Sequence, residues 1–389
     1  MPYYQLHPDQ GMNFQMNRVL TYGQEAGRLE EIKAIAARIT DYESWYSEWV
    51  APAHRAEEEQ RFLHAAYAYR MAEFFLLEGR PEKLACYQAF QDTFSRAVGE
   101  HAFERFAVPY ADSALPAMRL QAMPERAVVV IHGGYDSFME EFYLTVRTLP
   151  QHGYTVILFE GPGQGQALLN GLTFTHAWEH PTAAILDFFQ LSNVALLGIS
   201  WGGYLALRAA AFEPRIQYVI AYDVCYDGFE VMTRPMPSPL RFLIRIHARS
   251  AVNALIERLR KRSRLLDWAV AQGMHITGAK TPFEFYQKLT LHTMKGISHL
   301  VRQDVLLLAG QRDHYIPLEQ FYQQQRSLVN AHSVTARLFT VSEGGEQHCQ
   351  VGHHQLAVDE IARWLDAFAG GSPSRAVQSA GQVIRKSSK

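Results

Sequence analysis

The sequence predicts an α/β fold with a mostly parallel sheet, helices on both of its faces, a helical N-terminal region and an inserted helical cap. Two observations support the sheet. Short β-rich runs alternate with helical segments after about residue 104, and each run is almost continuously apolar. Such runs are typical of parallel strands that are buried on both faces. A third observation, a long helical stretch between two of these runs, indicates the inserted cap.

The N-terminal part of the chain has a helical pattern from about residue 24 to residue 100. Its apolar residues recur with a period near 3.6, as on a helix that buries one face. Gly79 and Pro81 divide this stretch, because glycine commonly ends a helix and proline suits the first turn of the next one. We assign residues 1–103 to a helical region that forms part of the cap.

The sheet is expected to contain at least six strands, separated by helical segments. We assign residues 104–226 and 299–370 to this core. The last stretch, 371–389, is small, polar and basic, which predicts a disordered tail. The six strand-like runs are 126–132, 154–160, 193–200, 216–223, 304–310 and 335–341.

The interval 227–298 interrupts the alternation of strands and helices. It has a helical pattern and is too long for a simple connection, so we interpret it as a cap inserted between two core strands. Its apolar side chains fit a carbon-rich or aromatic ligand, although each of them could instead attach the cap to the N-terminal helices. These residues are Phe229, Met232, Phe242, Trp268, Phe283, Phe285 and Tyr286.

A basic run in the same interval is interpreted first as a solvated helix face, with an anionic substrate group as the alternative. Its members are Arg258, Arg260, Lys261, Arg262 and Arg264.

Composition restricts the class of protein. The 389 residues include 48% hydrophobic and 20% charged residues, which is typical of soluble globular chains. A net charge of -2 argues against a protein that mainly binds nucleic acid or anionic membrane. No apolar run approaches the roughly 20 residues that span a bilayer, and the first residues lack a signal-peptide pattern. We therefore expect a cytoplasmic protein without a membrane or nucleic-acid partner, and a homodimer remains an open alternative to a monomer.

The strongest motif is Gly198-Ile199-Ser200-Trp201-Gly202, which fits G-x-S-x-G. A β-rich run leads directly into Ser200, and a helical run follows it. This strand–turn–helix context is what the nucleophile elbow of an α/β-hydrolase fold requires, because the sharp turn lifts the serine hydroxyl above the sheet. The alternative is an ordinary strand-to-helix turn that contains a serine. We predict that Ser200 is the catalytic nucleophile.

A serine nucleophile needs a base, and the base needs an orienting acid. In α/β-hydrolases these follow in the order serine, acid, histidine. Asp313 comes just after the strand-like run 304–310, and His348 lies on the loop after the last run. The order therefore predicts Asp313 as the acid and His348 as the base.

Other candidates compete less well. Asp304 begins its strand and so lies at the wrong edge of the sheet, whereas His353 and His354 lie near the start of the last helix and stay as alternatives to the base. His176 and His180 have a spacing known from helical zinc sites, but the accompanying glutamate is absent and proline follows directly. We expect no metal and no cofactor.

An oxyanion hole is predicted after the run 126–132, where His132-Gly133-Gly134-Tyr135 forms an HGG turn. In hydrolases a backbone amide of this turn binds the developing oxyanion, together with the amide of the residue after the nucleophile. Here those donors are the amide of Gly134 or Tyr135 and the amide of Trp201. A plain glycine turn is the alternative.

The segments HGGYDSFMEEF, FEGPGQGQ, GISWGGYLALRAA and EQHCQVGH together resemble one subfamily of α/β-hydrolases. That subfamily includes the 2,6-dihydroxypseudooxynicotine hydrolase of bacterial nicotine breakdown and fungal polyketide-shortening hydrolases of pigment synthesis. The resemblance implies cleavage of a carbon–carbon bond next to a ketone, with a helical cap over the active site. The expected partner is therefore a small carbonyl substrate, apolar or aromatic, with ester or thioester hydrolysis as the second choice and a non-catalytic binding protein as the third.

The resemblance also implies a role for the acidic residue that follows the HGG-x turn, which is Asp136 in this sequence. In the subfamily such a residue helps to handle the substrate. The alternative is that Asp136 caps the following helix, which is a common position for aspartate. Glu160, in the segment FEGPGQGQ, is interpreted as a residue that shapes its loop.

Overall fold

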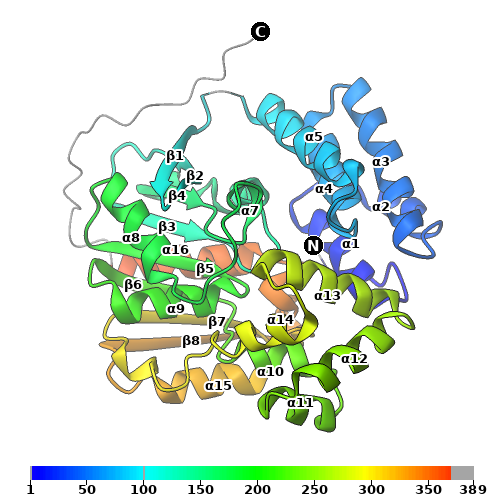
Figure 1. Cartoon of the computed structure of the whole chain (residues 1–389). Coiled ribbons are helices and arrows are strands. Elements are labelled where there is room, and N and C mark those ends of the chain that lie inside the picture. The colour runs from blue at the N-terminus through cyan, green and yellow to red at the C-terminus, as the bar shows by residue number, and fades with distance from the viewer. Residues whose placement is uncertain (1, 100, 369–389) are drawn as a thin grey trace.

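The computed structural model describes residues 2–99 and 101–368, so the tail predicted for 371–389 lies outside the described residues. An eight-stranded sheet forms the centre, in the order β1-β2-β4-β3-β5-β6-β7-β8 (Figure 1). All pairs from β4 to β8 are parallel, which confirms the predicted α/β class with a mostly parallel sheet. Those six strands are β3 (Ala127–His132), β4 (Tyr154–Phe159), β5 (Val194–Ile199), β6 (Ile216–Tyr222), β7 (Asp304–Gly310) and β8 (Ser333–Phe339).

Two further strands, β1 (Glu104–Tyr110) and β2 (Ser113–Leu120), form an antiparallel hairpin at one edge of the sheet. The sequence analysis assigned no strands to them. Each strand contains a proline, Pro109 in β1 and Pro116 in β2, and proline argues against a strand because it cannot donate to the ladder. Both prolines are tolerated because β1 has a neighbouring strand on one side only, and because Pro116 precedes Ala117–Leu120, the part of β2 that pairs with β4.

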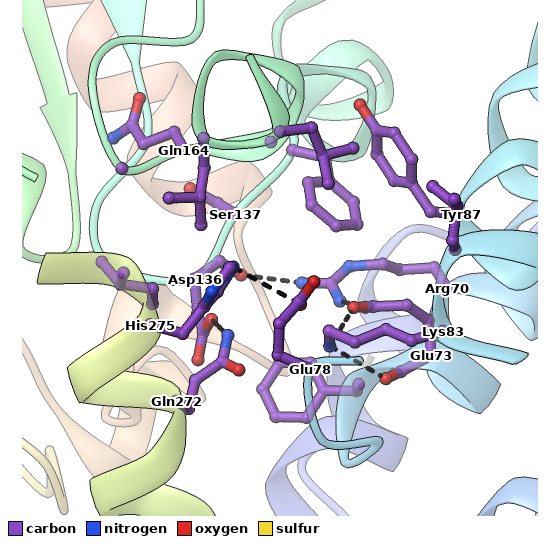
Figure 2. Close-up of a pocket in the computed structure, with 18 of the residues that line it drawn as sticks. Arg70, Glu73, Glu78, Lys83, Tyr87, Asp136, Ser137, Gln164, Gln272 and His275 are labelled. Carbon is purple, nitrogen blue, oxygen red and sulfur yellow. Dashed lines mark hydrogen bonds and ion pairs between the residues drawn. The ribbon is translucent and has the colours of Figure 1, made fainter. Parts of the chain in front are cut away.

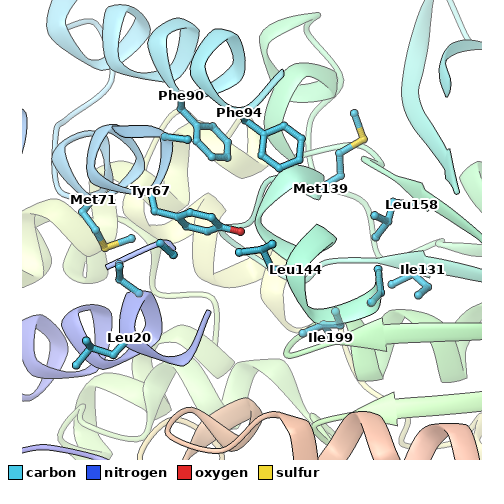
Figure 3. Close-up of a cluster of buried hydrophobic side chains, with 14 of the residues drawn as sticks. Leu20, Tyr67, Met71, Phe90, Phe94, Ile131, Met139, Leu144, Leu158 and Ile199 are labelled. Atoms are coloured by element: carbon cyan, nitrogen blue, oxygen red, sulfur yellow. The ribbon is translucent and has the colours of Figure 1, made fainter. Parts of the chain in front are cut away.

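Five helices precede the sheet in the sequence and lie beside it (Figure 1). They share a hydrophobic core with one face of the sheet, in which Tyr67, Phe90 and Phe94 lie near Leu144 and Ile131 (Figure 3). Strand residues alternate between the two faces, so every second one enters this core. The helices are α1 (Gln10–Thr21), α2 (Leu29–Ala36), α3 (Tyr42–Glu58), α4 (Phe62–Phe74) and α5 (Pro81–Val98).

The remaining helices of the sheet region cover both faces. Residues of α6 (Met139–Val146) and α16 (Gln355–Phe368) join the same core as the N-terminal helices. Residues of α8 (Glu179–Phe188), α9 (Gly202–Phe212) and α15 (Leu318–Ser327) join the second core on the opposite face. The short helix α7 (Gly165–Leu169) follows β4. The two cores enclose the sheet, which explains why its central strands are apolar on both sides.

Five more helices lie between β6 and β7, within the interval interpreted as a cap. The ring of Trp268 packs on those of Phe74 and Phe75 from the N-terminal region, at centroid distances of 5.7 and 5.1 Å. Trp268 therefore attaches this segment to the N-terminal helices, which is the alternative that the sequence left open. The helices are α10 (Gly228–Thr233), α11 (Ser238–Arg245), α12 (Arg249–Arg260), α13 (Arg264–Thr277) and α14 (Pro282–Leu289).

The other aromatic candidates of this segment differ in exposure. Phe229, Phe283, Phe285 and Tyr286 are buried in the second core, whereas Phe242 is exposed. Over the described ranges, no helix has both the length and the apolar character needed to cross a membrane.

Candidate active site

Ser200 occupies a sharp turn between β5 and α9. Its φ of 63° lies in the left-handed region, which a residue with a side chain rarely adopts. Small neighbours make the turn possible. A Cβ on Gly198 would lie 1.9 Å from the carbonyl oxygen of Gly202, and one on Gly203 would lie 1.8 Å from that of Asp223. The predicted strand–turn–helix context is therefore present, and the strained backbone presents the serine hydroxyl at the carboxyl edge of the sheet.

The structure brings together the three residues that the sequence predicts as a triad. The Ser200 Oγ lies 2.8 Å from Nε2 of His348. On the other side of the ring, Nδ1 of His348 lies 2.6 Å from Oδ2 of Asp313. The second carboxylate oxygen of Asp313 accepts hydrogen bonds from the amides of Tyr315 and Ile316, which fixes its orientation. This chain of contacts can transfer the serine proton to the imidazole.

A second carboxylate, which the sequence analysis missed, also contacts His348. Oδ2 of Asp223 lies 3.0 Å from Nδ1 of His348 and accepts a 2.6 Å hydrogen bond from the amide of Cys349. Asp223 is buried and directly follows β6, so it reaches the same edge of the sheet as Ser200 and Asp313. Because Asp223 ends the strand-like run 216–223, its position in the sequence could have indicated a place at this edge of the sheet. Nδ1 of His348 thus faces two carboxylates.

The electrostatics of this group favour a charged imidazole. Burial by itself lowers the pKa of His348, but the neighbouring carboxylates of Asp313 and Asp223 outweigh it and hold the pKa well above the ordinary value. An imidazolium next to Ser200 is the state that forms once the serine has given up its proton. The two acids therefore stabilise the product of the proton transfer.

The HGG turn after β3 lies directly against the nucleophile elbow. A Cβ on Gly134 would lie 2.7 Å from the amide nitrogen of Trp201, so only glycine allows this approach. The side chain of Gln164 donates to the carbonyl oxygens of Gly133 and Gly134, at 2.8 and 2.7 Å. Those bonds orient the carbonyls toward Gln164. Gln164 comes from the segment FEGPGQGQ, and the sequence analysis gave it no role.

The side chain of Trp201 is also held in place. Its indole nitrogen donates to Nδ1 of His292 over 3.2 Å, and its ring lies 5.6 Å from that of Tyr135. Burial lowers the pKa of His292 to about 3, so this imidazole stays neutral and can accept the bond. The residue after the nucleophile, whose amide is a predicted oxyanion donor, is therefore fixed on both sides.

Asp136 lies next to the turn but does not cap the helix that follows. Helix α6 begins at Met139, whose amide donates to Glu160, and the amide of Phe138 just before the helix donates to Glu141. Oδ1 of Asp136 accepts a 2.9 Å hydrogen bond from Gln272 of α13. Burial raises the pKa of Asp136, although the nearby Arg70 guanidinium partly opposes the rise. The capping alternative is wrong, because the backbone directs this carboxyl group toward α13.

Glu160 has the loop-shaping position that the sequence indicated. Its two oxygens accept hydrogen bonds from the amides of Met139 and Gln166, at 3.1 and 2.7 Å. Burial is the main reason that its pKa rises to about 8.

Two aromatic side chains pack near the imidazole of His348. The ring of Tyr315 lies 5.1 Å from the imidazole, and the ring of Phe14 lies 6.0 Å from it. Phe14 comes from α1, so the N-terminal region contributes directly to the wall of the site. The ring of His314 packs against both of them, at centroid distances of 4.9 Å to Phe14 and 3.9 Å to Tyr315.

The competing candidates lie elsewhere or have other partners. Asp304 bonds to His332 and Ser333, at the opposite end of β7 from Asp313. Nδ1 of His353 lies 3.2 Å from the carbonyl oxygen of Glu343.

Among the described residues, one group of side chains has the spacing to hold a metal ion. It consists of Asp223, His348 and Cys349, which lie in the site described above. His176 and His180 are not members of such a group there.

Comparison with known proteins places these features in a family. A family model described as "Alpha/beta hydrolase family" matches residues 128–367. The 20-hydroxy-prefusarin hydrolase FUS2 of Gibberella moniliformis is 30% identical over 327 residues, covering 73% of this chain and 78% of that protein. The hydrolase acrC of Aspergillus aculeatus is 26% identical over 419 residues, covering 93% of this chain and 97% of that protein.

Solved structures show the same fold. The 2,6-dihydroxy-pseudo-oxynicotine hydrolase superposes with a TM-score of 0.69 at 18% identity, covering 93% of this chain and 98% of its own. AbyA5 superposes with a TM-score of 0.69 at 19% identity, covering 92% and 94%. The family model and the relatives confirm the resemblance inferred from the sequence motifs, and the solved structures confirm the fold.

Proposed function

Because the chain belongs to the alpha/beta hydrolase family, we propose that it is a serine hydrolase that cleaves a carbon–carbon bond next to a ketone. The observation that carries this proposal is the continuous contact from Ser200 through His348 to Asp313, at 2.8 and 2.6 Å. The substrate class is a β-dicarbonyl, aryl ketone or polyketide-like compound. A hydrolase named for 20-hydroxy-prefusarin among the relatives supports this choice.

In the first step Ser200 attacks a substrate carbonyl carbon while His348 takes the serine proton at Nε2. The carbonyl oxygen becomes an oxyanion, which the amide of Trp201 and an amide of the Gly134–Tyr135 turn can bind. The position of Gly134 against the Trp201 amide supports this pairing. Asp313 and Asp223 hold the imidazolium that has formed.

In the second step the bond between the attacked carbon and its neighbour breaks. The electron pair moves onto that neighbouring carbon, where the second carbonyl group delocalises it as an enolate. The carbon then takes up a proton from the Asp136 carboxyl group, which regains one from the His348 imidazolium. The ketone leaves, the imidazole is neutral again, and the acyl group stays on Ser200. Water attacks the acyl-enzyme with His348 as base, which releases a carboxylic acid and restores the serine hydroxyl.

Asp136 is our candidate for handling the departing carbon. Its carboxyl group lies two residues after Gly134, and burial raises its pKa, so it keeps a proton at higher pH than an ordinary aspartate does. An activated ester needs no such proton donor, because its leaving group is stable as an anion. This difference separates the first proposal from the second, which is ester or thioester hydrolysis by the same triad.

The test compares two substrates in wild-type protein, in Asp136→Asn and in Ser200→Ala. For a β-diketone, with both products identified by mass spectrometry, Asp136→Asn should lose at least about tenfold in kcat, since general acid–base catalysis typically contributes about 10²- to 10⁴-fold. Hydrolysis of p-nitrophenyl acetate should fall far less. Ser200→Ala should be inactive on both substrates.

Each other outcome has a meaning. Equal losses on the two substrates would indicate damaged oxyanion geometry, and no loss on either would favour the esterase. Absence of turnover on either class by wild-type protein would favour a binding protein on this fold.

A further inference from the structure

A cavity of about 230 Å³ lies where the N-terminal helices, α13 and the sheet region meet (Figure 2). Arg70, Glu73 and Lys83 enter it from the N-terminal helices α4 and α5, and Gln272 and His275 enter it from α13. On the side of the sheet its wall contains Tyr135, Asp136 and Ser137, which follow the oxyanion turn directly. The cavity therefore adjoins the HGG turn that faces Ser200, while Ser200 and His348 themselves are not part of its wall.

The cations of this cavity are already bound to acids of the protein. Arg70 pairs with Glu73 and Glu141, and its remaining nitrogen donates to the carbonyl oxygen of Asp136 over 2.7 Å. Lys83 pairs with the same Glu73. Arg80 pairs with Glu43 and Glu82 outside the cavity. A carboxylate or phosphate of a ligand would have to displace these partners, so the cavity is poorly suited to an anion.

Hydrogen-bond acceptors are available instead. The Nε2 of Gln272 donates a hydrogen bond to Oδ1 of Asp136, so the Oε1 of Gln272 points away from Asp136. Within the described part of the chain, Oε1 of Gln272 and Oγ of Ser137 are buried and have no hydrogen-bond partner. Gln272 is only 8% exposed, so the missing partner is costly unless a ligand supplies a donor. Figure 2 shows Gln272 at the edge of the cavity next to Asp136.

The rest of the wall is apolar. It is formed by side chains from α4, α7, α13 and the loop before α6, which suit a carbon skeleton rather than a hydrated ion. These residues are Phe74, Phe138, Leu168, Leu169 and Ile276.

We propose that this cavity binds the hydroxyl-bearing end of a neutral, carbon-rich substrate, such as a phenol or polyol, while the ketone lies at Ser200. Gln272 accepts a hydrogen bond from a substrate hydroxyl, and Ser137 provides a second polar contact. The inference rests on the proposed function and adds a substrate class to it: hydroxylated and uncharged.

The test measures binding without turnover in Ser200→Ala, by isothermal titration calorimetry. The three ligands are a dihydroxyphenyl β-diketone, its dimethoxy analogue and a carboxyphenyl analogue. The dihydroxy compound should bind about tenfold more tightly than the dimethoxy compound, as expected for a buried hydrogen bond that one ligand cannot make. The carboxyphenyl compound should bind most weakly.

Two further variants, each added to Ser200→Ala, locate the effect. Gln272→Met should abolish the preference for hydroxyl groups, and the matched change Gln325→Met on the exposed face of α15 should leave it intact. Leu169→Trp should weaken both neutral ligands, because it fills the cavity from a position that is 44% exposed and tolerates a larger side chain. If Gln272→Met does not fold, the binding of the two neutral ligands to Leu169→Trp decides whether they occupy the cavity.

The inference is wrong if the two neutral ligands bind equally, if the preference survives Gln272→Met, if Leu169→Trp leaves binding unchanged, or if the carboxyphenyl compound binds best. Because the assay needs no catalysis, these results are separate from the failure of the proposed function, which would appear as absence of products from wild-type protein.

Discussion

His348 faces two carboxylates at the same ring nitrogen, and this arrangement bears on how activity depends on pH. Protonated imidazole cannot accept the Ser200 proton, so kcat/KM should fall as the pH drops through the pKa of His348. That pKa is raised, because the effect of the carboxylates exceeds that of burial. The acidic limb of the profile should therefore lie above about 6.5, the ordinary value for histidine.

We predict that Asp223→Asn moves this limb to lower pH, because the change removes one negative charge beside the imidazolium but keeps the size of the side chain. The measurement is kcat/KM on p-nitrophenyl acetate as a function of pH in both proteins. A residue that only supported the fold would lower the rate without moving the midpoint. An unchanged midpoint in Asp223→Asn would thus remove Asp223 from the electrostatics of the site.

The identity of the base gives a second prediction at this scale. His348→Ala should lose about as much activity as Ser200→Ala, roughly four decades in kcat, because triad residues act as a unit. His353→Ala is the matched control, since its imidazole contacts the carbonyl oxygen of Glu343 and no triad residue. An active His348→Ala combined with an inactive His353→Ala would transfer the role of base.

The chain order and the strand ends predicted Ser200, Asp313 and His348 as one group, and the structure brings these three side chains into contact. Asp223 and Gln164 were missed for a physical reason. Asp223 contacts His348, which is 125 positions away in the sequence. Gln164 contacts Gly133 and Gly134, which are about 30 positions away. No local pattern reports such contacts.

At the scale of elements, α4 is joined to the sheet region by a buried ion-pair group. The guanidinium of Arg70, on α4, contacts Glu141 on α6 and the carbonyl oxygen of Asp136, and it also pairs with Glu73. All of these side chains except Asp136 are almost completely buried. Removal of the cation leaves Glu73 with Lys83 and Glu141 with Arg18 as their remaining partners, and it removes the donor to the Asp136 carbonyl oxygen. Loss of a buried cation that joins two acids is more damaging than loss of an exposed pair.

We predict that Arg70→Met lowers the free energy of unfolding by about 3 kcal/mol or more, measured by urea denaturation. Arg38→Met is the control, because Arg38 pairs with Glu48 at the surface and should contribute much less. Similar losses in the two variants would contradict the view that Arg70 holds α4 against the oxyanion turn.

Elements were predictable to different degrees. The six parallel strands stand out as apolar runs because both of their faces are buried. The hairpin of β1 and β2 does not, since it lies at an edge and carries Pro109 and Pro116. The contact of Trp268 with Phe74 and Phe75 was left open by the sequence, because an aromatic residue on a helix can face either a ligand or another helix.

At the scale of the whole molecule, three regions converge on one site. The sheet provides Ser200, Asp313 and His348, the N-terminal helix α1 provides Phe14, and the segment between β6 and β7 provides Gln272 and the bond from His292 to Trp201. A site assembled from distant parts of the chain can exclude water from a reacting carbonyl, which strengthens the electrostatic contacts inside it.

The central claim is that Ser200 is an activated nucleophile, and covalent labelling tests it most directly. Wild-type protein is incubated with a fluorophosphonate, and the intact mass and the modified peptide are determined by mass spectrometry. We predict one added phosphonyl group, located on Ser200, with no labelling of Ser200→Ala and strongly reduced labelling of His348→Ala. Folded wild-type protein that stays unlabelled, or that carries the group on another residue, would contradict the account.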